Sequence, residues 1–117
     1  AVQQKIQALD LLANVREQGE VLKSRLLDRL GNHAHVGDIR GRGLMLAVEL
    51  IDPKTGDPLD GERFGKVKAG IKEEGVLVGG MSHCLPGPES MLFLSPPLIL
   101  TEQEADKIIN AFEASIP

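Results

Sequence analysis

The sequence predicts an α+β domain in which a small, mostly antiparallel sheet carries its helices on one face. Apolar residues recur at helical spacing near both ends of the chain and in its middle. Three short apolar runs bounded by glycine or proline lie between these stretches and predict strands. The predicted order is α-β-β-α-β-β-α. At 117 residues, the chain has room for one domain with its own core.

Residues 1–30 carry the first helical pattern. We expect two helical pieces, broken or kinked near Gly19, with a stop at Gly31 and Asn32. Because no capping residue precedes the first apolar position, the chain is expected to begin in mid-helix, as a piece of a longer protein. The apolar positions are Val2, Ile6, Leu9 and Ala13, then Val21, Leu22, Leu26 and Leu30.

An Arg-Gly-Arg-Gly cluster follows, formed by Arg40, Gly41, Arg42 and Gly43. Its guanidinium and backbone N–H groups could hold a phosphate or a carboxylate. A phosphate-binding glycine loop opens a helix, however, whereas this cluster opens a strand. The favoured interpretation is therefore a turn or bulge in which Gly41 and Gly43 adopt positive φ. Whether Arg40 or Arg42 reaches an active site stays open.

The run from Leu44 to Leu50 is apolar except for Glu49. Such a run predicts a central strand, either covered on both faces or flanked by neighbouring strands. A buried carboxylate needs a partner, so Glu49 is expected to face an arginine, a backbone donor or the solvent side of the sheet. Residues 52–58, with two prolines and a glycine, predict a loop.

The second half of the chain repeats the alternation of helix and strand. A helix is expected over residues 60–74, ending at Gly75, and a short strand over residues 76–79. Residues 81–90 contain glycine and two prolines near their centre and predict an irregular loop.

Residues 91–95 predict the last strand, which Pro96 and Pro97 stop because neither proline can donate a ladder hydrogen bond. Thr101 and Glu104 form a capping box, in which hydroxyl and carboxylate satisfy free N–H groups at the start of a helix. One face of that helix is apolar and carries Ala105, Ile108, Ile109 and Phe112.

Composition narrows the classes of function. A net charge of -4 provides no basic surface of the kind that nucleic acid requires. The single cysteine excludes an internal disulfide, and no secretory signal or run of eighteen apolar residues is present. We therefore expect a cytoplasmic domain that binds neither nucleic acid nor membrane.

No complete catalytic group is evident. His33 and His35 have no cysteine or carboxylate at metal-ligand spacing, so no metal site is expected. His83 and Cys84 are adjacent, but neighbouring residues rarely aim both side chains at each other and no third residue orients them. Ser95 lacks the context of a nucleophile elbow. The chain alone is expected to be inactive.

Three segments in this order, VGDIRGRGLMLAVELI, GVLVG and FLSPPLILTEQEADKII, resemble the C-terminal small domain of class III aminotransferases of fold type I. The pair formed by Arg-Gly-x-Gly-Leu-Met and Pro-Pro-Leu-Ile is fairly specific. The resemblance implies that residues 1–18 continue a helix from a missing large domain and that residues 19–117 form the small domain.

The resemblance also implies the chemistry of the whole protein. Members use pyridoxal 5'-phosphate to move an amino group from an amine or amino acid to an oxo acid, usually as homodimers. The cofactor's lysine, its acidic partner and its phosphate site belong to the large domain, so no cofactor is expected on this chain. On this interpretation the motif residues have a structural role and no catalytic one; they are Gly41, Gly43, Pro96 and Pro97.

In the family, the small domain helps to select the substrate. Members that accept an α-carboxylate commonly carry an arginine at the position of Phe93, and another subgroup carries one at or near Gly79. Here Gly79 and Gly80 supply no side chain. Phe93 is expected either to line an apolar part of the pocket, favouring an amine or ω-amino acid, or to pack in the core. Arg42 is a further candidate for substrate binding.

Two other interpretations stay open. A decarboxylase, an aminomutase or a racemase shares the same fold, and the sequence of the large domain would distinguish them. A free-standing, non-enzymatic α+β module could instead use Arg40 and Arg42 to hold an anion.

Overall fold

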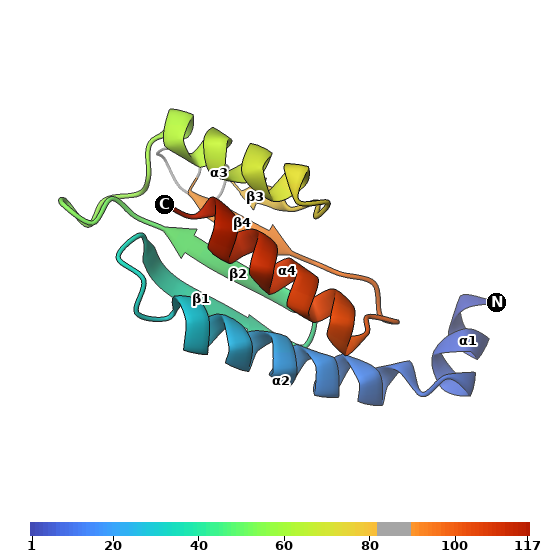
Figure 1. Ribbon diagram of the computed structural model, residues 1–117. Helices are drawn as coiled ribbons and strands as arrows, with labels where there is room; N and C mark the ends of the chain where they lie inside the picture. Colours follow the sequence, from blue (N-terminus) through green and yellow to red (C-terminus); the bar gives the residue numbers. More distant parts are fainter. Residues whose placement is uncertain (82–89) are drawn as a thin grey trace.

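The computed structural model describes residues 1–81 and 90–117, and it confirms the predicted α+β class. Its elements in chain order are α1 (Val2–Ala8), α2 (Leu11–Leu30), β1 (Val36–Arg42), β2 (Met45–Leu50), α3 (Gly61–Glu73), β3 (Gly79–Met81), β4 (Met91–Leu94) and α4 (Glu102–Ser115). The three longer helices form a layer against the sheet, while α1 lies apart beside the start of α2 (Figure 1). Among the described helices, none has the length and apolar character that crossing a membrane requires.

The sheet is antiparallel throughout, with strand order β1-β2-β4-β3. Strands β2 and β4 are central: Leu46 pairs with Leu94, and Val48 pairs with Leu92. The prediction of a central strand after the glycine cluster is confirmed.

The core lies between the sheet and the helix layer. Strand β2 contributes Leu46, Val48 and Leu50, all at most 1% exposed. The helices add apolar residues at three- to four-residue spacing, as an amphipathic helix requires. They are Leu22, Leu26 and Leu30 of α2, Phe64, Val67 and Ile71 of α3, and Ala105, Ile108, Ile109 and Phe112 of α4.

Helix α2 runs without interruption through Gly19, so the predicted break at that residue is wrong. The chain instead bends between α1 and α2, where Asp10 adopts the left-handed conformation with φ of 48°. Gly19 is required for another reason. A Cβ there would lie 2.8 Å from the Cα of Gly43 and closer still to its carbonyl carbon and oxygen. Helix α2 and the turn after β1 therefore touch backbone to backbone.

That turn has the conformation predicted for the Arg-Gly-Arg-Gly cluster. Gly41 has φ of 140° and Gly43 has φ of 58°, values that favour glycine. The Lys23 ammonium of α2 donates a hydrogen bond of 3.0 Å to the Gly41 carbonyl, adding a second tie between helix and turn.

Helix α3 begins at a true cap and ends where predicted. The carboxylate of Asp60 accepts a hydrogen bond of 2.9 Å from the backbone N–H of Arg63, and Gly75 has φ of 85° just after the helix. The predicted strand over residues 76–79 is misplaced, since β3 begins only at Gly79. Only residues 79–81 find partners on β4, while the preceding Val76 is buried in the core.

Helix α4 confirms half of the predicted capping box. The Thr101 hydroxyl accepts a hydrogen bond of 3.3 Å from the backbone N–H of Glu104. The Glu104 carboxylate, however, accepts a bond of 3.1 Å from that hydroxyl, a pairing in place of the predicted one to a backbone N–H.

The contact between α2 and the turn gives a prediction for Gly19→Ala. The added methyl group has no room, so the variant should lose about 1–3 kcal/mol of unfolding free energy, as overpacked sites do. Urea denaturation of the chain measures this change. Gly65→Ala in α3 is the matched control, because its Cβ meets nothing within 4 Å. It should gain about 0.5–1 kcal/mol from helix propensity. Equal stability of the two variants would contradict the contact.

Candidate functional site

The sheet face opposite the helix layer carries residues from all four strands. Arg40 of β1 pairs with Ala47 of β2, Ala47 pairs with Phe93 of β4, and Phe93 pairs with Gly79 of β3. These four residues form a line across the sheet, which we call the cross-strand row. Because side chains alternate along a strand, the row points away from the core residues Leu46 and Leu92.

Phe93 therefore lies outside the core between the sheet and the helices, which favours the alternative that it lines a pocket. Its neighbours Leu92 and Leu94 are at most 3% exposed, whereas Phe93 is half-buried on the other face. A Cβ built on Gly79 would lie 3.8 Å from the Cβ of Phe93, an ordinary van der Waals distance. Gly79 thus leaves open the space beside the phenyl ring.

The other two predicted substrate-binding residues do not join this pair. Gly80 pairs with the buried Leu92, so its position belongs to the helix side of the sheet. Arg42 lies at the turn end of β1, opposite Met45. It lines a pocket with Arg16 on α2 rather than the space beside Phe93.

Arg40 is tied to two carboxylates. Its guanidinium donates a hydrogen bond of 2.8 Å to Asp38 and one of 3.2 Å to Glu49, as expected for Glu49. The bond to Asp38, and then the bond to Glu49, raise the pKa of the Arg40 guanidinium. Its outer nitrogen lies 3.7 Å from the sulfur of Met91. With one cation and two carboxylates, this end of the row carries net negative charge and offers no unpaired cation to an anionic substrate group.

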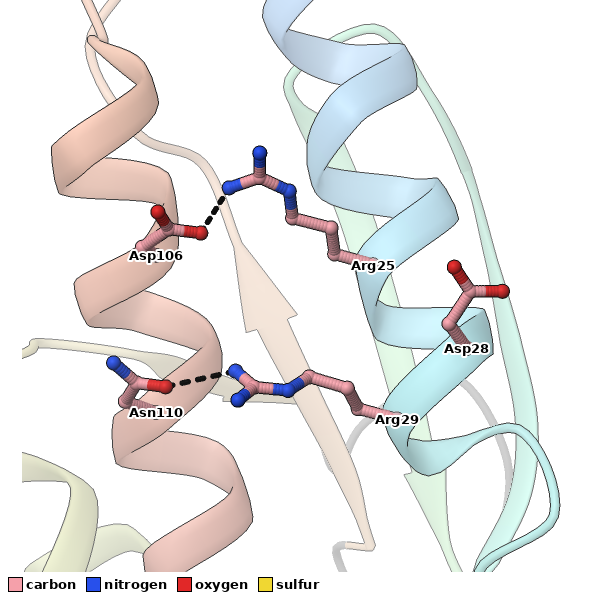
Figure 2. Close-up of a pocket in the computed structure, with 5 residues that line it drawn as sticks. All are labelled: Arg25, Asp28, Arg29, Asp106 and Asn110. Atoms are coloured by element: carbon pink, nitrogen blue, oxygen red, sulfur yellow. Dashed lines mark hydrogen bonds and ion pairs between the residues drawn. The ribbon is translucent and has the colours of Figure 1, made fainter.

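A second groove, which no sequence pattern predicted, runs between α2 and α4. Figure 2 shows Arg25 directed at Asp106 and Arg29 directed at Asn110 across this groove, the latter at 2.8 Å. Arg25 also pairs with Glu102, whose hydrogen bond is the main cause of the raised pKa of the Arg25 guanidinium. Both arginines are occupied in holding the two helices together.

β4 ends at Leu94, one residue earlier than predicted, and Pro96 and Pro97 follow after Ser95. The two prolines line a groove of about 340 Å³ between the end of α3 and α4. Lys107 and Glu104 border the same groove. A phosphorylated cofactor bound through lysine would also need cationic or N–H donors for its phosphate. The described lining supplies no arginine, and Lys107 is exposed on the helix surface. The lining of this groove therefore does not fit pyridoxal phosphate.

Two histidine-containing groups were considered from the sequence, His33 with His35 and His83 with Cys84, and the structure describes only the first. His33 and His35 are neighbours, and the ring nitrogen Nδ1 of His33 accepts a hydrogen bond of 3.1 Å from the backbone N–H of His35. Within residues 1–81 and 90–117, no three His, Cys, Asp or Glu side chains gather as metal ligands. His83 and Cys84, like the rest of residues 82–89, lie outside the described residues.

Two members of these sites were missed by sequence analysis. Ala47 is small and apolar within an apolar run, so nothing marks it as facing outward beside Phe93. Arg16 comes 26 positions before Arg42. Only the contact between α2 and the turn brings the two to one pocket.

Comparison with known proteins gives consistent matches. The family model described as Aminotransferase class-III matches residues 1–116. A taurine–pyruvate aminotransferase of Rhodobacter capsulatus is 37% identical over 91% of this chain and 23% of its own length. An alanine/serine racemase of Pyrococcus horikoshii is 33% identical over 95% of this chain and 22% of its own.

Among solved structures, a Bacillus anthracis aminotransferase superposes with a TM-score of 0.89 at 30% identity. The match covers 97% of this chain and 25% of that one. The chain thus spans about a quarter of the length of the proteins it matches.

Alanine substitution should change the unfolding free energy differently at Gly79, on the open face, and at Gly41, before the turn. Gly79→Ala places a methyl group in free space beside Phe93 and should change the unfolding free energy by no more than about 0.5 kcal/mol. Gly41→Ala puts a Cβ 2.7 Å from the Cα of Leu46 at positive φ and should cost about 2 kcal/mol or more. Urea denaturation compares them; a larger loss for Gly79→Ala would refute the geometry described for the row.

Proposed function

Because the chain belongs to the class-III aminotransferase family, we propose that it is the C-terminal small domain of a pyridoxal-phosphate-dependent transaminase. The observation that carries this proposal is the family match over residues 1–116. The chain spans only about a quarter of the length of its relatives, as one domain of such an enzyme would. The whole enzyme would transfer an amino group from an amine or ω-amino acid to an oxo acid. The cofactor, which acts as the electron sink, would bind the rest of the longer protein, since the groove beside Pro96 and Pro97 does not fit it.

The role assigned to this chain is to form one wall of the substrate pocket through the cross-strand row. Phe93 offers an apolar ring, and Gly79 leaves space beside it. Arg40 is balanced by Asp38 and Glu49, so the row holds no spare cation to grip a carboxylate bidentately. These features support an amino donor whose reacting carbon bears no carboxylate.

The named substrate of one relative agrees with that chemistry. Taurine, in the name of the Rhodobacter capsulatus enzyme, carries its amine on a carbon without a carboxylate. We propose donors of this kind, plain amines and ω-amino acids, for the present protein. A cytoplasmic homodimer is the form in which we expect it to act.

A racemase is the second candidate, since the Pyrococcus horikoshii relative bears that name. The two reactions differ in their balance. Transamination consumes one oxo acid for each amine converted, whereas racemisation consumes none.

Activity of the longer protein tests the proposal. The coding region extended upstream of Ala1, expressed with pyridoxal phosphate, should convert pyruvate to alanine when an amine or ω-amino acid is supplied, and the 117-residue chain should not. Chromatographic measurement of alanine and of the carbonyl product checks the one-to-one balance. Inversion of an amino acid without consumption of pyruvate would assign the racemase instead.

The pocket role of Phe93 is tested by Phe93→Arg in the longer protein. An arginine there should raise kcat/KM for α-amino acids relative to plain amines by at least about tenfold, which corresponds to about 1.4 kcal/mol of transition-state binding. Met45→Arg is the control, because this substitution adds the same charge at a residue that is 61% exposed near the turn. It should leave the ratio unchanged, and an unchanged ratio in Phe93→Arg would remove Phe93 from the pocket.

A further inference from the structure

The arginines of this chain divide into two groups. Arg25, Arg29, Arg40 and Arg63 each form ion pairs with carboxylates. The side chains of the remaining two, Arg16 and Arg42, form no ion pair or hydrogen bond with other described residues. Both line the same pocket, of about 580 Å³, between α2 and the turn after β1. We propose that this pocket binds a small oxyanion, that is, a carboxylate, sulfonate or phosphate group.

The charge around the pocket suits an anion. Arg16 and Glu20 lie one turn apart on α2, and Lys23 follows on the same side of the helix, where its ammonium reaches the Gly41 carbonyl. The lining itself holds two cations, Arg16 and Arg42, and one carboxylate, Glu20, while Lys23 adds a third cation at the neighbouring Gly41. This cationic surplus stands out in a chain whose net charge is -4, and its groups belong to two separate elements. Guanidinium groups are suited to such ligands because they can donate two parallel hydrogen bonds to oxygen pairs.

The pocket is also held in place before any ligand arrives. Gly19 brings α2 into backbone contact with Gly43, and Lys23 donates to the carbonyl of Gly41. Arg16 lies one turn of the helix before Gly19, and Arg42 directly precedes Gly43. The same contact therefore fixes the distance between the two arginine-bearing backbones, so little ordering of the backbone opposes binding.

The groove between α2 and α4 provides a useful contrast. Its arginines, Arg25 and Arg29, are each engaged by carboxylates from the facing helix. An anion would have to displace these partners there. In the pocket of Arg16 and Arg42 the carboxylate in the lining is Glu20, which forms no ion pair with either arginine.

The test is a titration of the isotope-labelled 117-residue chain with inorganic phosphate, followed by the NMR shifts of the Gly41 and Gly43 amides. Ionic strength is held constant with sodium chloride, because surface charge alone attracts any anion. Acetate and methanesulfonate are titrated in parallel, and the tightest of the three probes identifies the oxyanion class. Saturable shifts at these glycines are expected.

Four variants distinguish specific binding from general attraction. Arg16→Gln and Arg42→Gln should each weaken binding about tenfold or more, since each removes charge-assisted hydrogen bonds. Lys54→Gln removes the same charge from the exposed loop after β2 and should leave the affinity within about twofold. Glu20→Gln removes the carboxylate in the pocket and should tighten binding, a gain that misfolding cannot produce.

Two results would overturn the proposal. One is the absence of saturable shifts at Gly41 and Gly43 up to about 50 mM of each probe, far weaker than specific anion sites bind. The other is an equal loss of affinity in Lys54→Gln and in the two arginine variants. Circular dichroism spectra confirm that each variant keeps its helices.

Discussion

Strands β2 and β4 lie side by side at the centre of the sheet, and their residues point alternately toward the helices and away from them. Leu46, Val48 and Leu92 must face the helix layer, because they complete the core. This requirement fixes the register, and the register places Ala47 and Phe93 on the other face. A slip of one residue would turn this pair toward the helix layer and turn the core residues away from it. The composition of the open face thus follows from the packing of the core.

The architecture was predictable because it depends on local signals. The periodicity of the helices, the glycines of the turn and the prolines after β4 each act over a few residues, and the structure confirms them. Gly19 was misread because a glycine inside a helix suggests a break, whereas here it permits contact with Gly43, a residue distant in sequence. The bend at Asp10 could not be predicted, because no glycine or proline lies near it in the sequence.

The site was less predictable for a similar reason. Strand β4 reads Met-Leu-Phe-Leu, apolar at every position, so polarity cannot show which residues face the core. The interaction partners of the arginines were equally hard to predict from the sequence. Arg40 and Arg42 occupy equivalent places in an Arg-Gly repeat, yet Arg40 meets Glu49 across the hairpin, while Arg42 shares a pocket with Arg16 on another element. The cluster is a turn in which one arginine stabilises the sheet and the other lines an anion pocket.

We propose that the open face of this sheet, at Phe93 and Gly79, forms part of the substrate pocket of a transaminase. A crystal structure of the longer enzyme with pyridoxal phosphate and a bound amine or ω-amino acid examines it directly. The phenyl ring of Phe93 is expected to lie within about 4.5 Å of the bound donor, with the space beside Gly79 open to it. Phe93 covered by protein on all sides, with the donor contacting other elements only, would contradict the claim.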